Sequence, residues 1–170
     1  MIRRRFSPVW LFAALALALA GCTREDASPR AVALDLKEYM ATFQKWEARE
    51  KVVFGALSDV EQSQYVDDDF VARTLKDALP DAEGHIREIS EYRPKTRELT
   101  EVHERYRHGW EDLKVSLAAM ISAVETKDYV ALARAKSQMQ SARVNLLKAL
   151  QILDAMLEEN EQELLKLKKS

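Results

Sequence analysis

Glycine and proline are scarce in this chain. Of its 170 residues, four are glycine and four are proline. Proteins built from strands and tight turns need many more such residues. The abundant residues, among them Leu, Ala, Glu, Lys and Arg, are good helix formers. The composition therefore predicts an all-α fold.

Apolar residues recur at helical spacing, which indicates amphipathic helices. The first helix is expected to begin at Ser28-Pro29, where serine can cap and proline suits the first helical position. Gly55 is expected to weaken or end it. Ser58-Asp59-Val60-Glu61 has the form of a capping box and predicts a second helix over residues 59–79.

Three further segments complete the expected helical pattern. Residues 80–84 are predicted to be a connection, with a short helical piece before Arg93. A long helix is expected from Pro94 to Glu125, because proline disfavours helix at the residue before it. A tight turn is predicted at residues 126–128. The last helix, over residues 128–168, is long enough to project or to pair with another molecule. Four amphipathic helices with short connections predict an antiparallel four-helix bundle.

The first 22 residues have the organisation of an export signal. Arg3, Arg4 and Arg5 precede twelve apolar residues, Val9 to Ala20, and small residues follow. A positive start, a short apolar stretch and small residues at the cleavage point are typical of secretory signals. Twelve residues are fewer than the roughly 20 that a membrane-spanning helix needs. We therefore expect a cleaved signal peptide over residues 1–21.

Leu19-Ala20-Gly21-Cys22 resembles the lipobox of bacterial lipoproteins at all four positions. The resemblance implies cleavage before Cys22, diacylglycerol on its sulfur, and acylation of the new N-terminus by a fatty acid such as palmitate. Two or more acyl chains anchor a protein stably to a membrane. Thr23 stands where enterobacterial inner-membrane lipoproteins have Asp, so the resemblance favours the outer membrane, facing the periplasm. Residues 22–30 would be the lipidated cysteine and a short tether, and residues 31–170 the helical bundle domain.

The expected mature chain is mildly acidic. Without Arg3, Arg4 and Arg5 it has 23 of the 26 Lys and Arg residues, against 28 Asp and Glu. Nucleic-acid binding requires a basic surface, so a nucleic-acid partner is not expected. Cys22 is the only cysteine.

No motif for catalysis is present. No serine lies in a Gly-x-Ser-x-Gly sequence, and no cysteine remains once Cys22 is lipidated. His103 and His108 are five residues apart, about 140° around a helix, so they cannot readily share a metal ion. Asp67-Asp68-Asp69 lacks the alternating acids and the glycine of a calcium loop and predicts a solvated acidic patch. We expect no enzymatic activity, no cofactor and no metal site.

Aromatic residues on the apolar stripes are expected to form the core, with Trp46 and Trp110 as anchors. If the chain has a ligand pocket, we expect it near His103, Tyr106, His108 and Trp110. The sequence thus predicts a lipid-anchored, non-enzymatic bundle of the cell envelope. It would act through contacts with an envelope protein or as a structural spacer. The alternative is a bundle that binds a small ligand or a metal in the periplasm.

Overall fold

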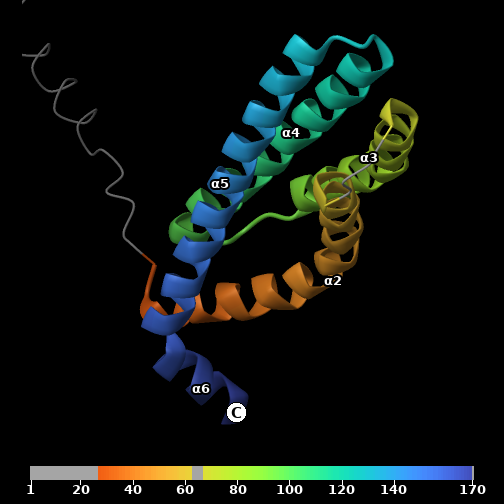
Figure 1. The fold of residues 1–170 in the computed structure, drawn as a ribbon. Helices are drawn as coiled ribbons and strands as arrows, with labels where there is room; N and C mark the ends of the chain where they lie inside the picture. Colours follow the sequence, from red (N-terminus) through yellow and green to blue (C-terminus); the bar gives the residue numbers. More distant parts are fainter. Residues whose placement is uncertain (1–26, 63–66, 170) are drawn as a thin grey trace, which may run out of the picture.

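The computed structural model describes residues 27–62 and 67–169, and the signal sequence and Cys22 lie outside these residues. The described residues form helices only, which confirms the all-α prediction. The five helices are α2 (Pro29–Gln62), α3 (Asp68–Glu91), α4 (Arg97–Glu125), α5 (Tyr129–Glu159) and α6 (Glu161–Lys169) (Figure 1). Among them, no helix combines the length and the apolar character that crossing a bilayer requires.

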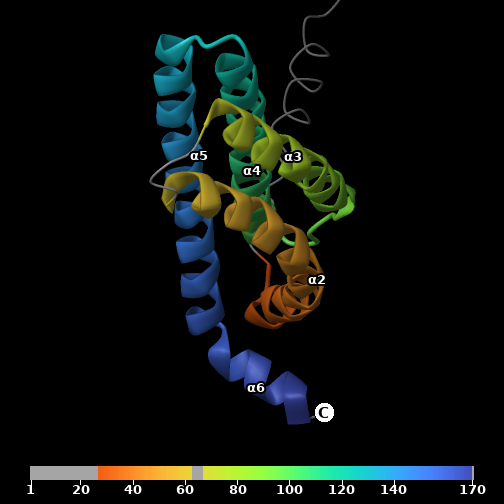
Figure 2. The same cartoon turned by 45° about the vertical axis from the view of Figure 1, so that its right-hand side comes forward.

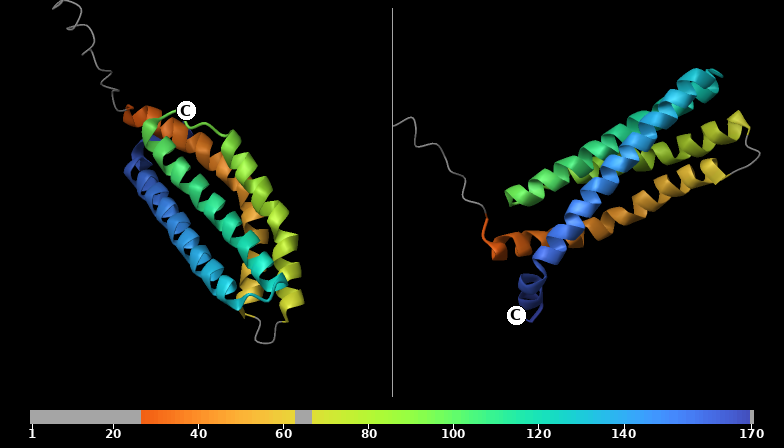
Figure 3. Two further views of the ribbon diagram at one scale, coloured as in Figure 1. Left: turned by 90° about the horizontal axis from the view of Figure 1, so that it is seen from above. Right: turned by 60° about the vertical axis from the view of Figure 1, so that its left-hand side comes forward.

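Helices that follow one another in the chain pack against one another. α4 and α5 lie side by side, α3 packs on α4, and α2 packs on α3 (Figures 1 and 3). The short helix α6 leaves the line of α5 and packs on α2 (Figure 2). α4 is central, because it contacts α2, α3 and α5. Its buried residues include Tyr106, Trp110, Leu113 and Leu117.

The first helix is longer than predicted. Ser28 caps it as expected, since its hydroxyl accepts from the Ala31 amide at 3.3 Å. However, α2 continues past Gly55 to Gln62. A glycine inside a helix costs only about 1 kcal/mol relative to alanine, and burial of Val53 and Leu57 on either side offsets that cost. The prediction of a capping box at Ser58 is wrong, because this residue lies inside α2.

The second helix is shifted along the chain relative to the prediction. Asp67 is its N-cap, and the carboxylate accepts from the Phe70 amide at 2.7 Å. The acidic triplet therefore begins a helix, and carboxylates are favourable there. The connection predicted at residues 80–84 is wrong, because α3 runs through Pro80. Its buried face continues beyond the proline at Ala82, His85 and Ile89.

The remaining boundaries agree more closely with the predictions. The long helix α4 ends at Glu125 as expected, but it starts at Arg97, three residues after the predicted start at Pro94. The turn at residues 126–128 is confirmed, with Lys127 in the left-handed region at φ 55°. Asp128 caps α5 by accepting from the Val130 and Ala131 amides at 3.1 and 2.9 Å.

The last helix does not run unbroken to residue 168. α5 ends at Glu159, and Asn160 separates it from α6. The amide group of Asn160 donates to the Met156 carbonyl at 2.9 Å. Within α6, the Leu167 carbonyl accepts from Lys37 Nζ on α2 at 3.4 Å. The C-terminal segment therefore contacts the chain's own first described helix instead of projecting.

Candidate functional site

A cavity of about 280 Å³ lies between α2, α4 and α5. α4 lies between the other two helices here and packs closely on α5. Gly109 permits this close approach, because a Cβ atom at that position would lie 2.7 Å from Leu146 Cδ2. The cavity is lined by Glu50, Phe54, Tyr106, Trp110, Arg143, Leu146, Leu147 and Leu150.

Three polar side chains form a chain of contacts at this cavity. The Tyr106 hydroxyl donates to Glu50 Oε1. His85 Nε2 lies 3.1 Å from the Tyr106 oxygen and 3.8 Å from Glu50 Oε1. Because the hydroxyl gives its one proton to Glu50, we assign the remaining proton of the chain to His85 Nε2, which donates to Tyr106. This assignment leaves His85 Nδ1 as an acceptor, and that atom is buried without a partner.

Burial governs the protonation of these groups. Burial lowers the pKa of His85 to about 4, and the nearby Arg49 charge acts in the same direction. Burial raises the pKa of Glu50, and the Tyr106 hydrogen bond partly opposes that rise. Burial, followed by the Glu50 charge, raises the pKa of Tyr106 well above its usual range. At neutral pH the histidine is therefore uncharged and the tyrosine keeps its proton.

Trp110 forms one wall of the cavity and is fully buried. Its ring lies 4.1 Å from the His85 ring and 5.4 Å from the Phe54 ring, between centroids. The indole N–H is directed towards Glu50 and Tyr106 and lowers the pKa of each by hydrogen bonding, although neither oxygen lies in the geometry of a full hydrogen bond.

The structure brings together two of the four residues of the predicted pocket. Tyr106 and Trp110 line the cavity. His103 does not line the cavity and is buried behind it, with Nδ1 3.4 Å from the Tyr39 hydroxyl and its ring 6.2 Å from that of Trp46, which also contacts Tyr106. His108 is on the surface, 63% exposed, and its Nδ1 lies 3.1 Å from Glu111. That these four residues bind a ligand stays a prediction.

The predicted pocket did not include Glu50 and His85, although the sequence pattern indicates that both are buried. Glu50 lies on the same helical stripe as Trp46, Val53 and Leu57, and an acid on an apolar stripe is unusual. His85 follows Ala78 and Ala82 at the same helical spacing on α3. Both side chains therefore belong to buried faces, although only the packing shows that they meet.

A second opening on the same side of the molecule is larger, about 520 Å³, and includes Leu57, Glu61, Met120 and Lys136 in its lining. Glu61 Oε1 pairs with Arg143 Nη1 at 2.6 Å. Because Arg143 lines the first cavity and Glu61 the second, this ion pair joins α2 to α5 between the two openings.

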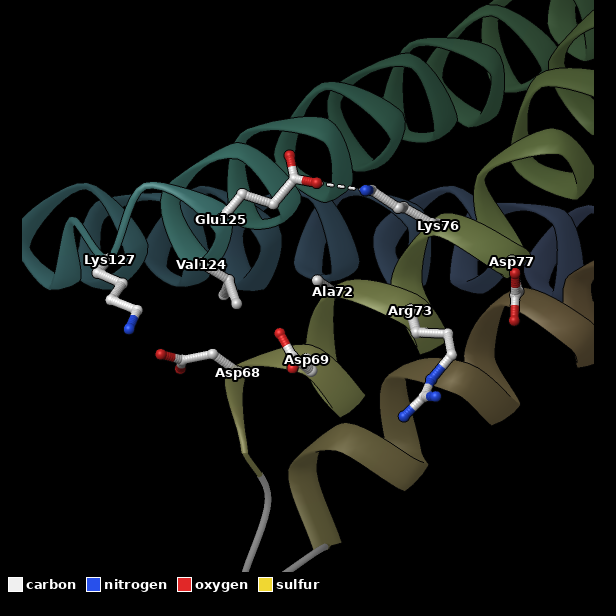
Figure 4. A pocket seen from close by; sticks show the side chains of 9 residues that line it. All are labelled: Asp68, Asp69, Ala72, Arg73, Lys76, Asp77, Val124, Glu125 and Lys127. Carbon is white, nitrogen blue, oxygen red and sulfur yellow. Dashed lines mark hydrogen bonds and ion pairs between the residues drawn. The ribbon is translucent and has the colours of Figure 1, made fainter.

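A third opening lies where α3 begins and α4 ends. Figure 4 shows acidic and basic side chains interspersed around it, with Lys76 paired to Glu125. Asp68 also accepts from the Tyr129 hydroxyl at 2.9 Å. In the described part of the chain, no three His, Cys, Asp or Glu side chains are grouped so that they could hold a metal ion. We therefore treat this opening as a solvated surface on which four acidic side chains alternate with three basic ones.

The cavity between α2, α4 and α5 thus combines an apolar wall with a half-buried carboxylate. This arrangement is suited to binding. Comparisons of the chain with protein-family models, with curated proteins and with solved structures find no match.

Proposed function

We propose that this chain is a lipid-anchored, non-enzymatic lipoprotein of the bacterial cell envelope whose helical domain binds a small molecule. The lipobox at Leu19-Ala20-Gly21-Cys22 supports the anchor, and the absence of Asp after Cys22 supports the outer membrane, facing the periplasm. We further propose that α2, α3, α4 and α5 form an antiparallel four-helix bundle, with α6 folded onto α2. The pairwise packing of successive helices supports that arrangement.

One observation carries the proposal of ligand binding. The cavity between α2, α4 and α5 combines a mainly apolar lining with the Glu50 carboxylate, whose side chain is 17% exposed. Small-molecule sites are mostly apolar hollows with a few polar groups placed to orient the ligand. Phe54, Leu146 and Leu150 supply the apolar surface here, while Glu50 supplies the polar group.

The test is a nuclear magnetic resonance screen of the lipidated protein with a mixed library of small fragments. We expect some fragments to shift the indole N–H signal of Trp110 and to leave that of Trp46 unchanged. Leu147 lies at the mouth of the cavity and is exposed, so Leu147→Trp should block binding without unfolding the protein. If no fragment shifts the Trp110 signal of the folded protein, the proposal of ligand binding is wrong.

A second candidate function, contact with an envelope protein, is favoured by the outer face of α5. Val144 and Ile152 are exposed there. Val144 lies about 200° around the helix from Leu146, which belongs to the buried face. Apolar side chains on the outer side of a helix fit a protein partner.

Photo-crosslinking in intact cell envelopes tests this second function. A photoreactive residue at Val144 should give a discrete crosslinked product, and one at the exposed Arg97 of α4 should not. Equal crosslinking from both positions, or from neither, would exclude α5 as the contact surface.

A further inference from the structure

Glu50 has no cationic partner within the described residues. The neighbouring Arg49 is held by Asp81 and Glu88 at 3.0 and 2.9 Å. Arg143, at the rim of the cavity, pairs with Glu61 at 2.6 Å. His85 is neutral at physiological pH, because burial lowers its pKa to about 4. The hydrogen bond from the Tyr106 hydroxyl is therefore the main compensation for this carboxylate.

A half-buried carboxylate in this position favours a positive ligand. The Glu50 side chain is only 17% exposed. Removing a charge from water is costly unless a partner of opposite charge or several hydrogen bonds replace the lost solvation. A ligand cation would supply the charge that the protein itself does not.

The walls of the cavity suit the same kind of ligand. Trp110, Tyr106 and Phe54 present aromatic rings, and such rings attract cations through their negative faces. Leu146, Leu147 and Leu150 line the α5 side and can cover an apolar body. A volume of about 280 Å³ is slightly below the range of about 300–1,000 Å³ common for ligand pockets, so the ligand must be small.

We propose that the cavity between α2, α4 and α5 binds a small organic amine, with its ammonium group at Glu50 and its apolar body against Phe54, Leu146 and Leu150. This inference rests on the proposed ligand-binding function and adds the chemical class of the ligand. An organic acid would be repelled by Glu50, since Arg143 is already engaged by Glu61. A neutral molecule would leave the carboxylate without a counter-charge.

Calorimetric titration with three probes of matched shape tests the proposal. The probes are 2-phenylethylamine, 3-phenylpropionate and 2-phenylethanol. The lipidated protein is carried in nanodiscs of zwitterionic lipid, and empty nanodiscs give the blank. We expect the amine to bind at least tenfold more tightly than the acid or the alcohol.

Two pairs of variants locate the site. Glu50→Gln should weaken amine binding at least tenfold, and Glu38→Gln, an equal charge change at an exposed position of the same helix, should alter it less than twofold. Leu147→Lys places a positive charge at the exposed mouth of the cavity and should also weaken amine binding. Val130→Lys, at the exposed start of α5, is its control. Because Leu147 is exposed, its variant keeps the test decisive if Glu50→Gln fails to fold.

The outcomes separate the two proposals. If Glu50→Gln or Leu147→Lys binds the amine as tightly as the unchanged protein does, the amine site is wrong. If the acid or the alcohol binds best and Leu147→Trp blocks it, the cavity is a ligand site but the chemical class is wrong. If none of the probes binds and the fragment screen is also negative, both proposals are overturned.

Discussion

Asp35 is a buried carboxylate whose partners all come from the start of α4. Its Oδ2 atom accepts from the Lys95 amide, the Thr96 amide and the Thr96 hydroxyl at 2.8, 2.7 and 2.8 Å. Thr96 is the N-cap residue of α4 and makes no capping bond of its own. Asp35 on α2 therefore supplies the hydrogen-bond acceptor that holds the start of α4. Its negative charge also suits the positive end of the α4 dipole.

Asp35→Ala should destabilise the domain strongly. The change leaves three donors without their acceptor, and we expect a loss of about 2–4 kcal/mol in the free energy of unfolding. Urea unfolding followed by circular dichroism measures it. Glu38→Ala is the control, because Glu38 lies one turn later on α2 and forms an exposed ion pair with Lys95. Such pairs contribute less than about 1 kcal/mol. Equal losses from both variants would contradict this role of Asp35.

His85 should make the domain sensitive to acid. Its pKa is about 4 in the folded chain and 6.5 for the ordinary group. Between these values the unfolded chain binds a proton at this residue and the folded chain does not. Stability is therefore fully present above pH 6.5 and is lost as the pH falls towards 4, by about 3 kcal/mol.

Other buried groups also affect how stability depends on pH. The prediction therefore compares the pH dependence of the His85→Gln variant with that of the unchanged protein. The pKa of His103 is also lowered by burial, and its contribution has the same sign. The raised pKa of Glu50 acts in the opposite direction, because the folded chain then holds its proton more tightly. We expect His85→Gln to flatten the loss of stability between pH 6.5 and 4, measured by urea unfolding at each pH. An unchanged slope in His85→Gln would show that His85 is not the group responsible.

At the scale of the helices, two glycines have opposite roles. A Cβ atom at Gly55 would have no neighbour within 4 Å, whereas one at Gly109 would lie 2.7 Å from Leu146 Cδ2 and 3.4 Å from its backbone nitrogen. Gly55 therefore lies in open space on α2. Gly109 lies at the contact between α4 and α5.

The same substitution at these glycines should have opposite effects. Gly55→Ala should stabilise the domain by about 0.5–1 kcal/mol, because alanine is the better helix former. Gly109→Ala should destabilise it by about 1–3 kcal/mol, because α4 and α5 must separate or Leu146 must move. Thermal unfolding of the two variants, compared with the unchanged protein, measures both effects. If both substitutions changed the unfolding temperature in the same direction, helix propensity alone would decide the effect of alanine on stability.

The helix boundaries show where reasoning from local sequence succeeds and where it fails. Asp128 was predicted to belong to a turn with capping residues, and it caps α5, because capping involves atoms only a few residues apart. Gly55 and Pro80 were expected to break helices and do not. Their cost is local, about 1 kcal/mol for the glycine and about 3 kcal/mol for the proline, while the buried faces of α2 and α3 continue across them. Tertiary packing therefore decides whether a helix survives a weak residue.

At the scale of the whole molecule, the expected anchor determines where the domain acts. Cys22→Ser should prevent lipidation, because the acyl chain is attached through sulfur. The variant should then lose its membrane attachment and shift to the soluble fraction of lysed cells. Mass spectrometry of the unchanged protein should show the loss of residues 1–21 and the added acyl chains. Ser137→Ala, which keeps the lipobox, is the control for fractionation. A Cys22→Ser variant that remains in the membrane fraction would contradict the lipid anchor.

The sequence by itself determined the all-α class, the turn at residues 126–128 and the aromatic core that includes Trp46 and Trp110. These features follow from periodicity and capping, which operate within one helix. Only the tertiary structure decided that Glu50 meets Tyr106, 56 residues away, and that α6 folds onto α2. The helical period shows which face of a helix is buried, but it does not show which residues of another helix that face contacts. The cavity at Glu50 depends on that pairing of faces, because its walls come from three helices.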